Sequence, residues 1–104
     1  MPALIRPLGA LALLLLAAPG CRRAPVTEDE CQRLLDRYTE QLARVDRPHL
    51  ATVELEKLQA EARTRAATHG PFKDCPRQLS REQMDCALGA FNPDEIERCL
   101  VPVP

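Results

Sequence analysis

Apolar positions after residue 26 recur at helical spacing, and no segment alternates apolar and polar side chains as a half-buried strand would. The first pattern begins at Thr27, which can form a capping box with Glu30. The preceding residue, Val26, is placed to pack against Cys31. These signals predict a helix from Thr27 to about Val45. Its expected apolar stripe consists of Cys31, Leu34, Leu35, Tyr38 and Leu42.

The second pattern predicts a helix capped by Asp46, with Pro48 in its first turn. Gly70-Pro71 should end this helix, because glycine suits the left-handed C-terminal position and proline cannot continue. Its many alanines suggest close approach to a neighbouring helix, and Leu55 falls off the main apolar face. The expected stripe consists of Leu50, Val53, Leu58, Ala62 and Ala66.

A loop is expected from Phe72 to Leu79, and a third helix from Ser80. Ser80 and Gln83 are spaced as a capping box, and Leu79 is placed to pack against Met84. This assignment makes Ser80 a helix cap rather than a nucleophile, since no neighbouring motif offers a base. The expected inward face consists of Met84, Ala87, Leu88 and Phe91.

A fourth, short helix should start at Asn92-Pro93, where a capping side chain is followed by proline and two acids. Ile96, Cys99 and Leu100 should face inward. Together, the patterns predict an all-α, small disulfide-stapled helical domain: a long helical hairpin plus a shorter C-terminal helical hairpin packed against it.

The first twenty residues differ from the rest of the chain. Leu8 to Ala18 is apolar or glycine throughout and follows a single cation, Arg6. A helix that spans a bilayer needs about 18 or more apolar residues, so this run is too short to be one. Its length and the small residues after it are typical of a secretory signal peptide, which we expect to be residues 1–20.

The end of this signal peptide resembles a known sequence motif. Ala18-Pro19-Gly20-Cys21 is similar to a lipobox, so the chain resembles a bacterial lipoprotein over residues 1–21. The resemblance implies that Cys21 becomes the mature N-terminus and is acylated, which anchors the protein in a membrane. Residues 21–26 then form a lipidated tether and residues 27–104 the helical domain. Aspartate after the cysteine signals inner-membrane retention in enteric lipoproteins, and Arg22 in its place favours the outer membrane.

The remaining cysteines form an even set, as a disulfide framework in an exported protein requires. Cys86 and Cys99 lie at equal sequence distances from the Asn92-Pro93 corner, so a hairpin brings them face to face. Cys31 can then meet Cys75, and we prefer Cys31–Cys75 with Cys86–Cys99. Cys75–Cys86 with Cys31–Cys99 stays open as the alternative.

The composition of the chain excludes several classes of function. The chain has 14 basic against 15 acidic residues, and Tyr38, Phe72 and Phe91 are its three aromatic residues. It therefore lacks the basic field and stacking platforms of a nucleic-acid binder. The cysteines are too far apart for a zinc site, and His49 and His69 lie at opposite ends of the second helix. We expect no catalytic residue, metal, cofactor or small-molecule substrate.

The sequence thus predicts a membrane-anchored lipoprotein of the bacterial envelope that faces the periplasm and acts as a protein-binding or structural module. Its partner would be another envelope protein. A pilotin-like secretion helper is a narrower alternative, for which the feature to seek is an apolar groove between helices that can accept a partner helix. A secreted helical effector or inhibitor, with Cys21 unlipidated, is the competing class.

Overall fold

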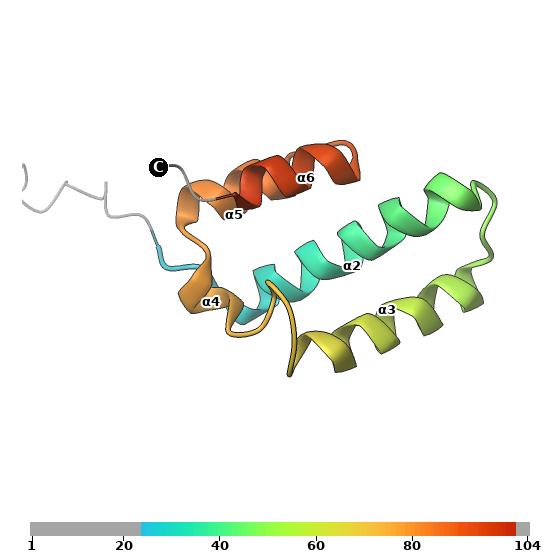
Figure 1. The fold of residues 1–104 in the computed structure, drawn as a ribbon, viewed down its shortest axis with the longest axis horizontal. Coiled ribbons are helices and arrows are strands. Elements are labelled where there is room, and N and C mark those ends of the chain that lie inside the picture. Colours follow the sequence, from blue (N-terminus) through green and yellow to red (C-terminus); the bar gives the residue numbers. More distant parts are fainter. Residues whose placement is uncertain (1–23, 102–104) are drawn as a thin grey trace, which may run out of the picture.

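The computed structural model describes residues 24–101, which form five helices and no strand (Figure 1). The expected all-α class is therefore confirmed. The predicted signal peptide, Cys21 and the first part of the tether lie outside the described residues. The helices are α2 (Glu28–Asp46), α3 (Thr52–Ala66), α4 (Cys75–Gln78), α5 (Arg81–Leu88) and α6 (Pro93–Leu100).

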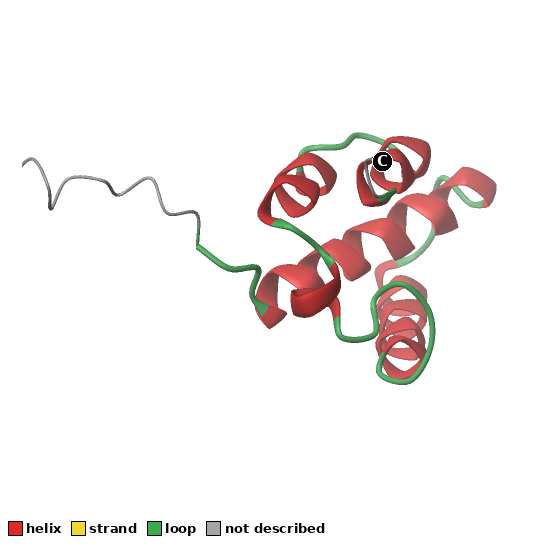
Figure 2. Ribbon diagram, turned by 60° about the vertical axis from the view of Figure 1, so that its left-hand side comes forward, coloured by secondary structure: helices red, strands yellow, loops and turns green. Residues whose placement is uncertain are grey.

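The central element is α2, which contacts all four other helices. Helix α3 runs back along one side of α2, and the hairpin of α5 and α6 covers another side (Figure 1). Figure 2 shows α2 running between these two parts. Among the described helices, α3 packs on α2 alone. The long hairpin of α2 and α3 and the short hairpin of α5 and α6 therefore meet along α2.

Local capping fixes where three of the helices begin. The side-chain oxygen of Thr27 accepts a hydrogen bond from the backbone N–H of Glu30, whose carboxylate accepts one from the backbone N–H of Thr27. Ser80 and Gln83 make the same reciprocal pair at α5. Asn92 caps α6, with Pro93 at its first position. Each cap satisfies amide groups that a helix start leaves without an intrahelical partner, and all three predicted caps are confirmed.

The core lies where α2, α4, α5 and α6 meet. Leu34, Met84 and Ile96 are fully buried there, each from a different helix. Tyr38 and Leu100 pack on the edge of this cluster. A separate set of buried leucines joins α2 to α3: Leu35, Leu50 and Leu55.

Two disulfides connect the elements. Cys31 of α2 is bonded to Cys75 of α4, with 6.1 Å between their Cα atoms. Cys86 of α5 is bonded to Cys99 of α6, with a Cα separation of 5.6 Å. This is the pairing preferred from the sequence. The first bond is buried, whereas Cys86 is exposed.

The predicted start of the second helix is wrong. Asp46 is the last residue of α2, and α3 begins at Thr52 after the uncharged residue Ala51. The residue before a proline is disfavoured in the helical region, so the chain leaves the helix at Arg47, before Pro48. A turn follows, closed by a hydrogen bond from the Leu50 N–H to the Arg47 carbonyl.

The face assigned to this second helix is also partly wrong. Val53, expected inside, is 78% exposed, and Leu55, placed off the main face, is 8% exposed. Leu50 precedes α3 and therefore cannot set the phase of its stripe. The buried and half-buried positions recur at helical spacing from Leu55 onward: Leu55, Leu58, Ala62 and Ala66.

Three further expectations need correction. Phe91 is 84% exposed, because α5 ends at Leu88 and the helical spacing no longer applies beyond Gly89. Leu42 is 43% exposed, since it faces the side of α2 that no helix fully covers. The expected loop from Phe72 to Leu79 contains the single helical turn α4, whose start carries Asp74 in the left-handed region at φ 55°.

Candidate functional site

The side chains singled out from the sequence do not converge on a reactive centre. His49 lies in the connection before α3 and His69 follows α3, and both are exposed. The hydroxyl of Ser80 is engaged as a helix cap. Between residues 24 and 101, no group of three or more histidine, cysteine or acidic side chains is placed to hold a metal ion. In the same range, no helix is long and apolar enough to cross a membrane.

A mainly apolar groove lies between α2 and α3, with a volume of about 530 Å³. It forms because alanines on both helices leave room between the larger side chains that flank them. The alanine-rich composition of the second predicted helix was the sequence signal for this close approach. We call this feature the α2/α3 groove, and its lining residues are Leu35, Tyr38, Thr39, Leu42, Ala43, Leu58, Ala62, Arg65, Ala66, His69, Pro71 and Phe72.

An aromatic pair closes one part of this groove. The rings of Tyr38 and Phe72 lie with their centroids 6.2 Å apart, at an interplanar angle of 33°. Burial raises the pKa of the Tyr38 phenol, and the carboxylates of Glu97 and Asp94 on α6 raise it further. Tyr38 is therefore a neutral hydroxyl at physiological pH, and it joins the groove to the α6 side of α2.

The basic side chains that line the α2/α3 groove are Arg65 and His69, and no acidic side chain lines it. The Arg65 side chain forms no ion pair or hydrogen bond within residues 24–101. The Nδ1 atom of His69 lies 2.7 Å from the hydroxyl of Thr68. No local sequence pattern singles out Arg65, and only the position of α3 against α2 shows that it borders a groove.

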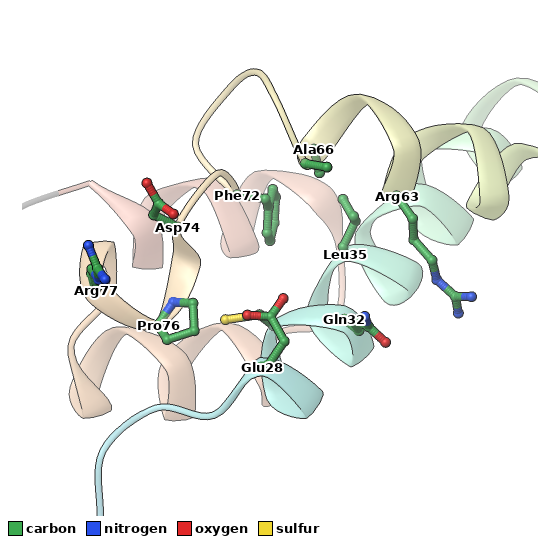
Figure 3. Close-up of a pocket in the computed structure, with 11 residues that line it drawn as sticks. Glu28, Gln32, Leu35, Arg63, Ala66, Phe72, Asp74, Pro76 and Arg77 are labelled. Atoms are coloured by element: carbon green, nitrogen blue, oxygen red, sulfur yellow. The ribbon is translucent and has the colours of Figure 1, made fainter.

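A second concavity, of about 390 Å³, lies beside the Cys31–Cys75 bond (Figure 3). Its apolar side is formed by Leu35, Ala66 and Phe72, which the view shows close together between α2 and the end of α3. Its polar side carries the amide of Gln32 and both charge signs, from Glu28, Arg63, Asp74 and Arg77. Such a mixture favours neither an anionic nor a cationic ligand.

Arg63 at the rim of this second concavity is already paired. The Nε of Arg63 donates to the Oδ1 of Asp36 on α2 at 2.9 Å, and the Nη2 of Arg63 donates to the Oδ2 of the same carboxylate. The ion pair raises the pKa of Arg63. Gln59 of α3 adds a hydrogen bond to the Asp36 carbonyl at 3.1 Å. These contacts therefore hold α3 against α2 rather than serving a ligand.

A third concavity, of about 440 Å³, lies where the corner between α5 and α6 meets α2. Exposed Phe91 and Val45 border it. Arg37 donates to the carbonyl of Ala90 and so attaches α2 to this corner. The Nε of Arg37 and the Oε1 of Gln41 are buried without a hydrogen-bond partner. Both atoms are covered by the protein itself, so neither is open to a ligand.

Residues 24 and 25, at the start of the described chain, are fastened to the helices by Arg81, a residue that sequence reasoning did not single out. Its guanidinium donates to the backbone carbonyls of Ala24 and Pro25, both at 3.0 Å, and to both carboxylate oxygens of Glu30, at 2.6 and 2.7 Å. A further bond reaches Asp85, one turn along α5. We call this set the Arg81 clamp, and it holds residues 24 and 25 against α2 and α5.

The Arg81 clamp has a clear electrostatic signature. Hydrogen bonds from Arg81 and from the Thr27 backbone lower the pKa of Glu30 from 4.5 to about 2. Glu30 and Asp85 in turn raise the pKa of Arg81. The pair is largely shielded from solvent, with side chains 17% and 14% exposed for Arg81 and Glu30.

No protein-family model matches the chain, and no curated protein or solved structure shows significant similarity to it.

Proposed function

We propose that this protein is a membrane-anchored envelope lipoprotein that binds another envelope protein through the α2/α3 groove. The observation that carries the proposal is the groove itself: an open, mainly apolar concavity on a small helical domain, lined by exposed and half-buried leucines and alanines. Concave apolar surfaces with few polar groups are the usual sites of specific binding. The proposal assigns the protein no reaction, metal or cofactor.

The anchoring half of the proposal rests on the lipobox-like end of the signal at Cys21. Several buried acyl chains, each contributing about 0.8 kcal/mol per CH₂, would make attachment effectively permanent. The Arg81 clamp supports this role, because it fixes Ala24 only three positions after Cys21. Three residues reach at most about 10 Å, so the clamp would keep the helical domain close to the membrane surface.

Photo-crosslinking in cells tests the binding half directly. A photoreactive amino acid replaces Leu42 in the full chain, expressed with its own signal peptide in a bacterium that processes it. Leu42 is 43% exposed and lines the groove. The matched control replaces Val53, which is 78% exposed on α3 and lines none of the three concavities described above. We expect a discrete adduct with an envelope protein from position 42 and none from position 53.

Two results would contradict the proposal. One is the absence of any adduct from position 42 when the protein is present at its normal level. The other is the same adducts from both positions, because such adducts would report random collisions at the membrane surface rather than occupancy of the groove.

A further inference from the structure

The dimensions of the α2/α3 groove limit what it can hold. Its α2 wall runs from Leu35 to Ala43, and its α3 wall runs from Leu58 to Ala66. Each wall therefore spans just over two helical turns, about 12 Å at 1.5 Å per residue. This is the length over which an amphipathic helix presents apolar side chains at positions i, i+3 or i+4, and i+7.

The walls also favour a helical occupant over an extended one. They consist of side chains from two helices, and no unpaired strand edge occurs in the part of the chain that the structure describes. An extended segment in this groove would bury backbone N–H and C=O groups without partners. A helix satisfies these groups internally, and the small side chains of Ala43, Ala62 and Ala66 let its apolar stripe approach closely.

The charge around the groove is unequal on its two sides. Arg65 and His69 line it at the α3 side, and no acidic side chain lines it. Arg65 has no partner within residues 24–101, so its positive charge is available. The carboxylates that raise the pKa of Tyr38 belong to Glu97 and Asp94. Both residues lie on α6, beyond the opposite flank of α2. An anionic group is therefore favoured beside α3 and disfavoured beside α6.

We propose that the α2/α3 groove receives an amphipathic α-helix of the partner protein, with its apolar stripe between α2 and α3 and its carboxylates beside Arg65 and His69. This inference rests on the proposed function and adds the class of element that is recognised and its orientation. Opposite charges placed this way raise the association rate and fix which side of the helix faces α3.

A display library tests the inference without knowledge of the partner. The library contains 18-residue helical peptides in which the stripe positions and the flanking positions are randomised. It is selected against the full chain, purified in detergent from membranes of a bacterium that processes it. We expect enriched peptides with an apolar i, i+3/i+4, i+7 stripe and with Asp or Glu concentrated along one flank.

Two matched pairs of variants then locate the binding. Arg65→Glu should weaken binding of an enriched peptide about tenfold, since it replaces attraction with repulsion. Its control, Lys57→Glu, makes the same charge change on α3 outside the groove and should leave the affinity within about twofold. Leu42→Gln should weaken binding by a similar factor, and Val53→Gln should not. Circular dichroism establishes that each variant is folded.

The outcomes separate this inference from the proposed function. Enrichment of basic or uncharged flanks, or equal effects of Arg65→Glu and Lys57→Glu, would overturn the acidic orientation. Enrichment of non-helical peptides, or of none, would overturn the helical occupant. In either case a crosslink from position 42 but not from position 53 would leave the proposed function standing, and its absence would remove both.

Discussion

Glu30 serves two structures with one carboxylate. It closes the capping box of α2 through the Thr27 backbone, and it accepts two hydrogen bonds from the Arg81 guanidinium on α5. The spacing Thr27–Glu30 is visible in the sequence and predicted the cap. The contact with Arg81 joins residues 51 positions apart, and no local pattern announces it. Such a contact exists only because the fold brings the start of α5 beside the start of α2.

The shifted pKa of Glu30 makes this contact measurable. Because its pKa of about 2 lies below the ordinary value of 4.5, the carboxylate stabilises the fold above pH 4.5. That contribution is lost as the pH falls from 4.5 through 2. We expect Glu30→Gln to lower the thermal midpoint by a few degrees at pH 7, and the difference from the parent protein to narrow over this pH range.

Glu28→Gln is the matched control for this titration. It removes a carboxylate from the same helical turn without touching the Arg81 clamp, so it should lower the midpoint less. A pH-independent difference for Glu30→Gln between pH 7 and pH 2 would show that the charge of Glu30 has no part in its effect.

The inverted roles of Leu55 and Val53 give a second prediction for single residues. Leu55→Ala should destabilise the protein by about 2 to 4 kcal/mol, because it empties a buried position between α2 and α3. Val53→Ala should change stability by less than about 0.5 kcal/mol, since its side chain is exposed. Urea denaturation of both variants measures the difference. Equal losses would contradict the unequal burial of the two residues, and a larger loss for Val53→Ala would favour the face expected from the sequence.

Among the described helices, α3 depends on a single interface. It carries one buried residue, Leu55, it packs on α2 alone, and neither disulfide includes it. Helix α2, by contrast, is held by the core, by α4 through a disulfide, and by the α5–α6 hairpin. The strength of the fold is therefore unequal on the two sides of α2.

Hydrogen exchange should show this inequality. We expect backbone amides in the middle of α3 to exchange faster than those of α2 and α6, because α3 can separate from α2 without disturbing the main core. Mass spectrometry of peptides from the exchanged protein resolves the helices. Equal protection of α2 and α3 would mean that they unfold as one unit.

The two disulfides should also differ. Cys86 is exposed, whereas Cys31 and Cys75 are 4% and 1% exposed, so a reductant reaches the α5–α6 bond first. Stepwise reduction with alkylation should therefore label Cys86 and Cys99 before Cys31 and Cys75. Labelling of Cys31 and Cys75 first, read by peptide mass spectrometry, would contradict this order.

The sequence separations of 44 and 13 residues set the relative cost of losing each bond. By loop-closure entropy, Cys31→Ala/Cys75→Ala should cost about 4 kcal/mol and Cys86→Ala/Cys99→Ala about 3 kcal/mol. Either loss is a large share of the stability of a small domain, so full reduction should largely unfold the protein. A full cooperative melt under strong reductant would contradict this expectation.

At the scale of the whole molecule, the proposed anchor and the groove act at different parts of one small domain. The Arg81 clamp fastens the tether beside the starts of α2 and α5, whereas the α2/α3 groove extends along α2 toward Leu42. A helix bound in this groove would therefore lie beside the domain rather than between its tether and its core. The anchor would restrict where the partner is met without covering the site.

Intact mass spectrometry tests the anchor. Protein extracted from membranes of a processing bacterium should have the mass of residues 21–104 plus acyl groups, and four thiols should become alkylated only after reduction. Cys21→Ala should abolish acylation and move the protein out of the membrane fraction. An unacylated chain with one thiol free before reduction would instead favour a secreted effector.

The sequence by itself determined the all-α class, the starts of α2, α5 and α6, and the division into two hairpins. These features depend on interactions within a few residues, such as Ser80 with Gln83 or Asn92 with Pro93, which any chain with these residues can make. Local patterns also suggested the close approach of the alanine-rich helix, although not the residues that it buries.

Three features depend on the tertiary structure alone. They are the buried face of α3, the attachment of residues 24 and 25, and the position of the open groove. Leu55 is buried and Val53 is exposed because the turn before α3 shifts the start of the helix. This shift changes which residues meet α2. Arg81 reached Glu30, and Arg65 reached the groove, through packing between distant segments. Helical spacing specifies which residues share a face, but only the neighbouring helices determine which face is covered.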